Sequence, residues 1–146
     1  MIYEERMQDL FTVSDEYYLV HCISGDYALG AGIAKTFDKK MDMKFKLFRD
    51  YPIPNGHAYA NVGKALLIDH RVFNLVTKNI CWSKPTYQML QMTLLDMKAQ
   101  CEELGVKKLA MPLIGCGLDK LEWSKVSTFI QAVFDDTDIE ILVCKI

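Results

Sequence analysis

Two glycine-rich segments carry the residues best suited to hold an anion. The first, SGDYALGAGIA (24–34), places Gly30 and Gly32 just before a helical pattern. The second, GCGLD (115–119), again stands between an apolar run and a helical pattern. Glycines let backbone N–H groups approach a bound anion, and a helix N-terminus adds partial positive charge. Either segment alone could be a structural turn, but two of them in one short chain favour a ligand that contains a diphosphate.

Lys78 is the charged residue whose position most invites a chemical role. It follows Thr77 at the end of the apolar run VFNLV (72–76). A lysine at such a position is most often a surface residue whose aliphatic stem covers apolar neighbours. Beside a phosphate it would be a counter-charge. In a partly desolvated site it could be a nucleophile toward a carbonyl-like or acetal carbon, provided that its amine is partly neutral.

Cysteine and histidine residues offer weaker candidates. The five cysteines are scattered without a C-x-x-C pair or zinc-ligand spacing, so we expect free thiols. Cys116 lies between two glycines, but no histidine motif supplies the base that a thiol nucleophile needs. His21 falls inside an apolar run and is expected to be a hydrogen-bonded core residue. A dinucleotide fingerprint would need glycine where Lys35 stands, and no motif calls for a metal ion or a cofactor.

Short apolar runs alternate with segments of helical period, which predicts an α/β fold with a mainly parallel or mixed sheet. Strands are expected at 17–23, 65–68, 72–76, 108–113 and 139–144, with another in the opening MIYEER, and helices at 31–40, 87–104 and 123–134. In such folds ligands bind beyond the carboxyl ends of the strands, where loops lead into helices. Both glycine-rich segments and Lys78 fall at such places.

The composition indicates a globular protein and argues against several other classes of protein. The chain has 146 residues, of which 51% are hydrophobic and 25% charged, and its net charge is -2. These values are typical of one globular domain and exclude a global basic field for nonspecific nucleic-acid binding. Lysines concentrate between Lys35 and Lys46, either as a local basic patch or, more simply, as a solvated helix face. No signal peptide or membrane-spanning run is evident, so we expect an intracellular, cytoplasmic protein, or a nuclear one in a eukaryote.

Three segments taken together resemble the macrodomain family. They are HCISGDYALGAGIA (21–34), VTKNICWSKPTY (76–87) and MPLIGCGLDKLEW (111–123). The resemblance is to the ALC1-like class, the branch of the terminal ADP-ribose protein glycohydrolases. It implies a single macrodomain over residues 1–146, with a three-layer α/β/α fold around a central mixed, mostly parallel sheet. It also implies that ADP-ribose binds in a surface cleft.

The resemblance assigns roles that spacing alone leaves open. Lys78 matches the family lysine that attacks the anomeric carbon of the distal ribose, and Asp119 matches the aspartate that completes hydrolysis. Asp9 matches the residue that hydrogen-bonds the adenine amino group, with Gln8 in place of the usual glycine before it. Cys144 stands in the last strand, where macrodomains often carry an aromatic ring near adenine. The other residues implied in binding ADP-ribose are Leu10, Ser24, Gly30, Ala31, Gly32, Ile33, Thr77, Gly115, Cys116, Gly117 and Leu118.

The expected function is removal of mono-ADP-ribose from glutamate or aspartate side chains of modified proteins. Lys78 would be the nucleophile and Asp119 the acid and base. Two alternatives stay open: hydrolysis of ADP-ribosylated nucleobases in DNA, and binding of ADP-ribose without catalysis, which the presence of both residues disfavours. The expected partners are ADP-ribose, as ligand and product, and an ADP-ribosylated protein or DNA. We expect a monomer that makes no association with membranes.

Overall fold

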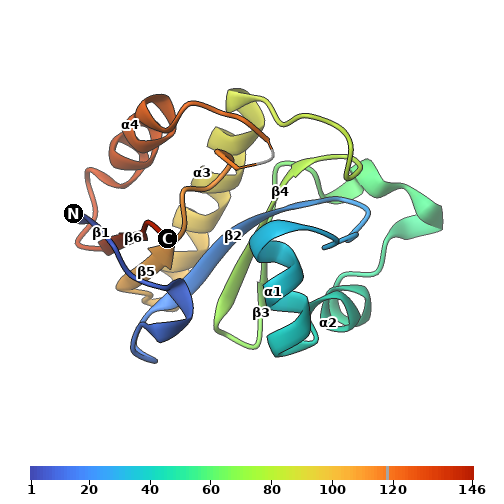
Figure 1. Ribbon diagram of the computed structural model, residues 1–146, viewed down its shortest axis with the longest axis horizontal. Coiled ribbons are helices and arrows are strands. Elements are labelled where there is room, and N and C mark those ends of the chain that lie inside the picture. Colours follow the sequence, from blue (N-terminus) through green and yellow to red (C-terminus); the bar gives the residue numbers. More distant parts are fainter. Residues whose placement is uncertain (118) are drawn as a thin grey trace.

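A mixed sheet forms the centre of the protein (Figure 1). The computed structural model describes residues 1–117 and 119–146. Within these ranges six strands run in the order β1-β6-β5-β2-β4-β3. Neighbouring strands are parallel except β3 and β4, which are antiparallel. The strands are β1 (Ile2–Arg6), β2 (Tyr18–Ser24), β3 (Ala65–Ile68), β4 (Val72–Lys78), β5 (Lys108–Met111) and β6 (Glu140–Cys144).

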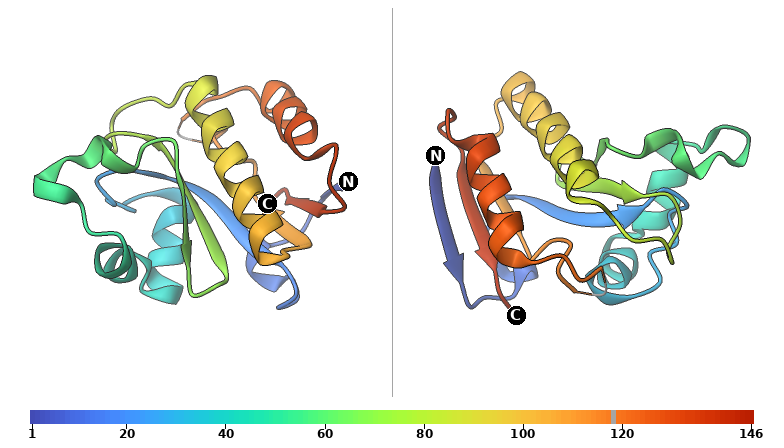
Figure 2. Two further views of the ribbon diagram at one scale, coloured as in Figure 1. Left: turned by 180° about the vertical axis from the view of Figure 1, so that it is seen from behind. Right: turned by 90° about the horizontal axis from the view of Figure 1, so that it is seen from above.

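Helices cover both faces of this sheet. Those on one face are α1 (Gly32–Met41) and α2 (Met43–Asp50), and those on the other are α3 (Tyr87–Leu104) and α4 (Trp123–Phe134), as the opposite views show (Figures 1 and 2). Short 3-10 turns are η1 (Leu10–Thr12), η2 (Pro54–Gly56) and η3 (Ala58–Asn61). One hydrophobic core packs between the sheet and α3 and α4, and a second between the sheet and α1 and α2. The expected three-layer α/β/α fold is confirmed. Among the described residues, no helix combines the length and hydrophobicity that a membrane crossing requires.

The central elements follow from their local sequence. The strands β2 and β4 are apolar on both sides because helices cover both of their faces, as is typical of buried parallel strands. Helix α3 has the predicted bounds because both of its ends are capped. Thr86 Oγ1 accepts a hydrogen bond from the N–H of Met89 at 3.1 Å, and Gly105 ends the helix with φ +72°.

The strand boundaries differ from the predicted ones at the edge where ligands are expected. β4 continues through Thr77 to Lys78, two residues further than its apolar run. β5 stops at Met111, and the prediction that it reaches Leu113 is wrong. Pro112 has no N–H to donate to a neighbouring strand, which accounts for the early end of β5.

Helix α2 is not predicted by the sequence pattern. The lysine-rich stretch 35–46 is divided between two helices, because Asp42 adopts a left-handed backbone conformation with φ +53°. Asp38 stabilises the break, since its Oδ1 accepts a hydrogen bond from the N–H of Lys44 at 2.9 Å. Aspartate tolerates this conformation better than most residues do, but neither glycine nor proline marks the break in the sequence.

His21 is a buried core residue, as predicted. Its ring stacks on Phe37 with the ring centroids 4.0 Å apart, and its Nε2 lies 2.5 Å from Oδ1 of Asn74. The amide nitrogen of Asn74 donates to the carbonyl of Leu66 at 3.0 Å, so Oδ1 faces the histidine as an acceptor and Nε2 carries the proton. Burial lowers the pKa of His21 to about 4.

This buried histidine should make the folded protein sensitive to acid. Below its ordinary pKa of 6.5, His21 gains a proton in the unfolded chain but stays neutral in the folded protein until about pH 4. The free energy of unfolding should therefore fall as pH drops from 6.5 to 4, by about 3 kcal/mol from this residue. Urea unfolding across this range measures the slope. His21→Gln, which keeps a donor for Asn74 without ionising, should flatten it. His70→Gln on the surface should not, and equal slopes in all three proteins would contradict the assignment.

Candidate functional site

The candidate residues gather along one edge of the sheet. β1, β6, β5, β2 and β4 are parallel, so their carboxyl ends share this edge, and the loops that follow β2, β4 and β5 lie along it (Figure 1). From β1 to β4 the edge spans four strand spacings of ~4.8 Å, which is roughly 19 Å. A ligand that contacts both ends must therefore be long and extended.

Lys78 and Asp119 form an ion pair at this edge. Nζ of Lys78 donates to Oδ1 of Asp119 at 2.6 Å, and the two side chains are only 13% and 18% exposed. Partial burial lowers the local dielectric, so these charges interact more strongly than a fully solvated pair does. The sequence predicts that both residues belong to the site, whereas their direct contact comes from the structure alone.

Separate elements hold the two partners in place. Lys78 is the last residue of β4, and its carbonyl accepts a hydrogen bond from the N–H of Gly25 at 2.8 Å. Asp119 lies in the loop between β5 and α4, which is closed by a hydrogen bond of 2.8 Å from the N–H of Leu121 to the carbonyl of Gly115. Gly115 has φ +73°, a conformation that favours glycine. Gly115 therefore serves the turn that carries Asp119.

Substituting Gly115 should destabilise this turn. Alanine there would adopt a left-handed conformation, and its Cβ would come within 2.9 Å of the Leu121 side chain. We expect Gly115→Ala to lower the free energy of unfolding by about 1–2 kcal/mol. Gly117→Ala is the matched control, because a Cβ added there meets no described residue within 4 Å. Denaturant unfolding of both variants measures the difference, and equal stabilities would contradict the requirement for glycine at position 115.

Ser24 lies beside Lys78 at the end of β2. The two residues are register partners across β2 and β4, just after an irregularity in the pairing between Ile23 and Ser24. The hydroxyl of Ser24 donates to Oδ1 of Asp26 at 2.5 Å. The structure thus brings this predicted binding residue next to the ion pair.

The N-terminus of α1 has the form expected of an anion site. Gly30, Ala31 and Gly32 are exposed, and Ile33 is half-buried. Ala31 is the N-cap residue, and it has no side-chain oxygen to occupy the first N–H groups of the helix. Those groups and the helix dipole can therefore act on a bound phosphate.

Buried side chains hold the loop before α1 in a strained conformation. Tyr27 and Leu29 have φ of +54° and +45°, which is costly for residues that carry a Cβ. Both side chains are buried, and the Tyr27 hydroxyl donates to the carbonyl of Tyr51 and accepts from Nδ2 of Asn61, each at 2.8 Å. Core packing thus fixes the path of the loop that leads to the candidate anion site.

The second glycine-rich loop is partly open. Gly115 and Cys116 are half-buried and Gly117 is exposed, while Leu118 lies outside the described residues. The Cys116 thiol donates to the carbonyl of Ile114 at 3.3 Å, and burial raises its pKa to about 11. A thiol in this state is protonated at neutral pH and is a poor nucleophile. This supports the reading of Cys116 as a loop residue.

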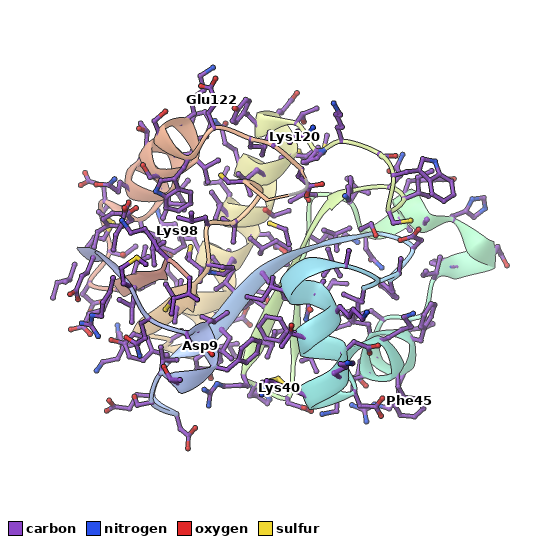
Figure 3. The ribbon with its side chains drawn as sticks, viewed as in Figure 1. Asp9, Lys40, Phe45, Lys98, Lys120 and Glu122 are labelled. Atoms are coloured by element: carbon purple, nitrogen blue, oxygen red, sulfur yellow. The ribbon has the colours of Figure 1, made fainter. Side chains whose placement is uncertain are left out.

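Asp9 and Leu10 lie at the far end of the edge. Asp9 is the N-cap of η1, where its Oδ1 accepts a hydrogen bond from the N–H of Phe11 at 2.9 Å, and Leu10 is buried. Burial raises the pKa of the neighbouring Cys144 thiol, with a smaller contribution from the charge of Asp9. Figure 3 shows Asp9 well apart from Lys120, which lies in the loop between β5 and α4. The predicted adenine end and the ion pair are therefore at different places along the edge.

Thr77 is another predicted binding residue that the structure buries. It is 2% exposed, and alternation along β4 directs its side chain to the face opposite that of Lys78. Within the described part of the chain, its Oγ1 has no hydrogen-bond partner. Contact between this hydroxyl and a ligand stays a prediction.

Two hollows in the surface lie away from the ion pair. One of about 420 Å³ lies between α3 and α4, against Leu95, Phe129 and Val133, and another of about 490 Å³ lies between the end of α3 and the start of β6. Neither is lined by Lys78 or Asp119. Across residues 1–117 and 119–146, no three metal-ligating side chains come together. Neither hollow therefore belongs to the candidate site.

Asp26 is a site residue that sequence reasoning missed. Its carboxylate accepts hydrogen bonds from Ser24, from the N–H of Ala28 and from the N–H of Cys81. The spacing Ser-x-Asp at the end of a strand was the available signal, because aspartate side chains often bond to backbone N–H groups two residues further on. The bond to Cys81 crosses 55 residues of sequence and has no local signal.

Comparison with known proteins gives the family. The model of the Macro domain family matches residues 20–130. The chain is 43% identical, over 136 residues, to the ADP-ribose glycohydrolase OARD1 of Homo sapiens and to that of Bos taurus, covering 92% of this chain and 86% of each relative. The macrodomain of Thermus aquaticus DarG has a TM-score of 0.83 at 20% identity, with 98% of this chain and 97% of that chain covered. Thermosipho africanus DarTG in complex with ADP-ribose has a TM-score of 0.81 at 19% identity, with 99% of this chain and 42% of that chain covered. With its α/β/α layers and loops gathered at the carboxyl edge, this chain belongs to the Macro domain family.

Proposed function

We propose that this protein is an ADP-ribosyl hydrolase of the ALC1-like class that removes mono-ADP-ribose from glutamate or aspartate side chains of modified proteins. The observation that carries the proposal is the ion pair of 2.6 Å between Lys78 and Asp119, next to two glycine-rich loops. The relatives that are 43% identical are named ADP-ribose glycohydrolases, which supports the same reaction class.

ADP-ribose fits the length and polarity of the edge. Its adenine would lie at Asp9, whose second carboxylate oxygen can accept from the amino group. Its diphosphate would lie between the loop at Gly115–Gly117 and the N-terminus of α1, whose first N–H groups have no side-chain cap. The distal ribose would then reach Ser24, Lys78 and Asp119, which are neighbours in the structure.

The ion pair allows a two-step hydrolysis. Nζ of Lys78 passes a proton to Asp119, and the neutral amine attacks the anomeric carbon of the distal ribose. The bond from this carbon to the glutamate oxygen breaks, and its electron pair leaves on the carboxylate. After Asp119 has lost its proton to solvent, it takes a proton from a water whose oxygen attacks the anomeric carbon. The bond from this carbon to Nζ breaks as the new bond forms, and its electron pair stays on the nitrogen. Asp119 then returns the proton to Nζ, which restores the ion pair, and ADP-ribose is released.

The test is the release of free ADP-ribose from a protein that carries glutamate-linked mono-ADP-ribose, followed by liquid chromatography. A serine-linked substrate is the matched control, because an alkoxide leaves far less readily than a carboxylate. We expect release from the glutamate ester only. ADP-ribose that binds without any release would leave the protein as a reader of the modification.

Hydrolysis of ADP-ribosylated nucleobases in DNA has less support from the structure. Apart from Lys35 in the first half of α1, the lysines that could bind nucleic acid lie in the second half of α1 and in α2. Figure 3 shows Lys40 at the end of α1 that is remote from the loop with Lys120. Lys46 is moreover paired with Asp69 at 2.5 Å. A DNA substrate modified on a nucleobase, added to the same assay, tests this alternative directly.

A further inference from the structure

Asp26 links the two loops that flank Lys78. One of its oxygens, Oδ1, accepts from the Ser24 hydroxyl at 2.5 Å and from the N–H of Ala28 at 3.2 Å. The other, Oδ2, accepts from the N–H of Cys81 at 3.1 Å, in the loop that follows β4. A single carboxylate therefore joins the end of β2 to the chain that leaves Lys78.

The surrounding backbone leaves this junction little freedom. The N–H of Gly25 donates to the carbonyl of Lys78 at 2.8 Å. A Cβ added to Gly25 would lie 1.9 Å from the carbonyl oxygen of Ala58 and 3.1 Å from that of Asn79. Three segments far apart in the sequence thus meet around residues 24–26, and Asp26 supplies the charged hydrogen bonds between two of them.

The bond from Ser24 to Asp26 decides what Ser24 can offer to a ligand. A hydroxyl has one hydrogen to donate, and Ser24 gives it to the carboxylate. Its oxygen keeps lone pairs, and the bond to a charged acceptor makes that oxygen a better acceptor itself. Ser24 is a register partner of Lys78, so a sugar within reach of Lys78 has its hydroxyl groups near Ser24.

We propose that Asp26 is a positioning residue that turns Ser24 into an acceptor for a hydroxyl of the distal ribose. The inference rests on the proposed function, because it places the distal ribose at Lys78. Asp26 itself touches neither the ligand nor the reacting atoms. Its role is to hold the Ser24 hydroxyl and the loop after Lys78 in one arrangement.

Asn at position 26 is the variant that separates this role from packing. It has the same shape as Asp, but only its amide oxygen accepts hydrogen bonds, so either the Ser24 side or the Cys81 side loses its acceptor and the negative charge is lost from both. Calorimetric titration should show that Asp26→Asn weakens binding of ADP-ribose by about 10-fold, the equivalent of one hydrogen bond. Binding of ADP, which lacks the distal ribose, should change less than about 2-fold by the same reasoning, since ADP makes no contact with Ser24. Asp135→Asn, the same change of charge at an exposed site remote from the edge, should alter neither.

A double-mutant cycle completes the test. If Asp26 acts through Ser24, then Ser24→Ala with Asp26→Asn should bind ADP-ribose no more weakly than the weaker single variant. An equal loss for ADP and ADP-ribose, additive losses, or no loss in Asp26→Asn would each overturn the inference. If the unsubstituted protein binds ADP and ADP-ribose but hydrolyses no substrate, the proposed hydrolase is contradicted while the role of Asp26 can still be tested. If it binds neither ligand, the proposed hydrolase and the role of Asp26 are both contradicted.

Discussion

Lys78→Ala should abolish release of ADP-ribose from a glutamate-linked substrate, with turnover lowered by on the order of 10³-fold or more. Lys78→Arg should be equally inactive. Arginine keeps the positive charge and can bond to Asp119, but its guanidinium does not lose a proton and cannot attack a carbon. The pair of variants thus separates a nucleophile from a counter-charge, the two roles that a lysine at the end of β4 could have. Single-turnover release from glutamate-linked substrate measures the effect.

The controls use another ion pair of the same chain. Lys107 and Asp138 lie 3.0 Å apart on the surface and are 62% and 75% exposed. Lys107→Ala should release ADP-ribose at the parent rate. Calorimetry should show that Lys78→Ala still binds ADP-ribose, because the adenine and diphosphate contacts that we propose are elsewhere along the edge. Activity above about a tenth of the parent value in Lys78→Arg would contradict the nucleophile and favour the counter-charge.

The parts of the fold that sequence predicts are those governed by neighbouring residues. Thr86 and Gly105 fix both ends of α3 through bonds within its own first and last turns, so the prediction of this helix is confirmed. His21 is recognised as a core residue because apolar residues surround it in the sequence. The division of the lysine-rich stretch depends instead on Asp42, whose left-handed conformation is supported by a bond from Lys44 to Asp38. That bond spans the break and has no periodic signal.

The candidate site likewise has residues that the sequence predicts and contacts that it does not. Lys78 and the glycines are predicted because strand ends and turns leave a local signal, and parallel strands bring those ends to one edge. The contact of Lys78 with Asp119 joins residues 41 apart, and the link from Asp26 to Cys81 joins residues 55 apart. Sequence pattern contains no distance of this kind. The roles of these residues therefore depend on contacts that only the folded chain creates.

Asp119→Asn should slow both steps of the reaction, and high pH should restore only the first. Asparagine has nearly the shape of aspartate, but it cannot take a proton from Nζ of Lys78 or from the water of the second step. We expect steady-state release to fall by about 10²–10⁴-fold, the range typical of a lost acid or base. Raising the pH supplies hydroxide to deprotonate the lysine, so the first step should recover in part while the second stays slow. Intact-mass analysis of the variant with substrate at high pH should then show ADP-ribose bound covalently to the protein.

The location of that adduct decides the mechanism. Peptide mapping should place it on Lys78, and the double variant Asp119→Asn with Lys78→Arg should form none. Asp138→Asn, on the surface pair, should show the parent rate and no adduct, because its carboxylate lies far from the edge. Recovery of turnover at high pH without a lasting adduct would mean that Asp119 acts only before the attack, as the base that frees Nζ across 2.6 Å. Loss of turnover without an adduct at any pH would contradict the lysine nucleophile. An adduct that forms and stays would mean that the same carboxylate is needed to bring in the water.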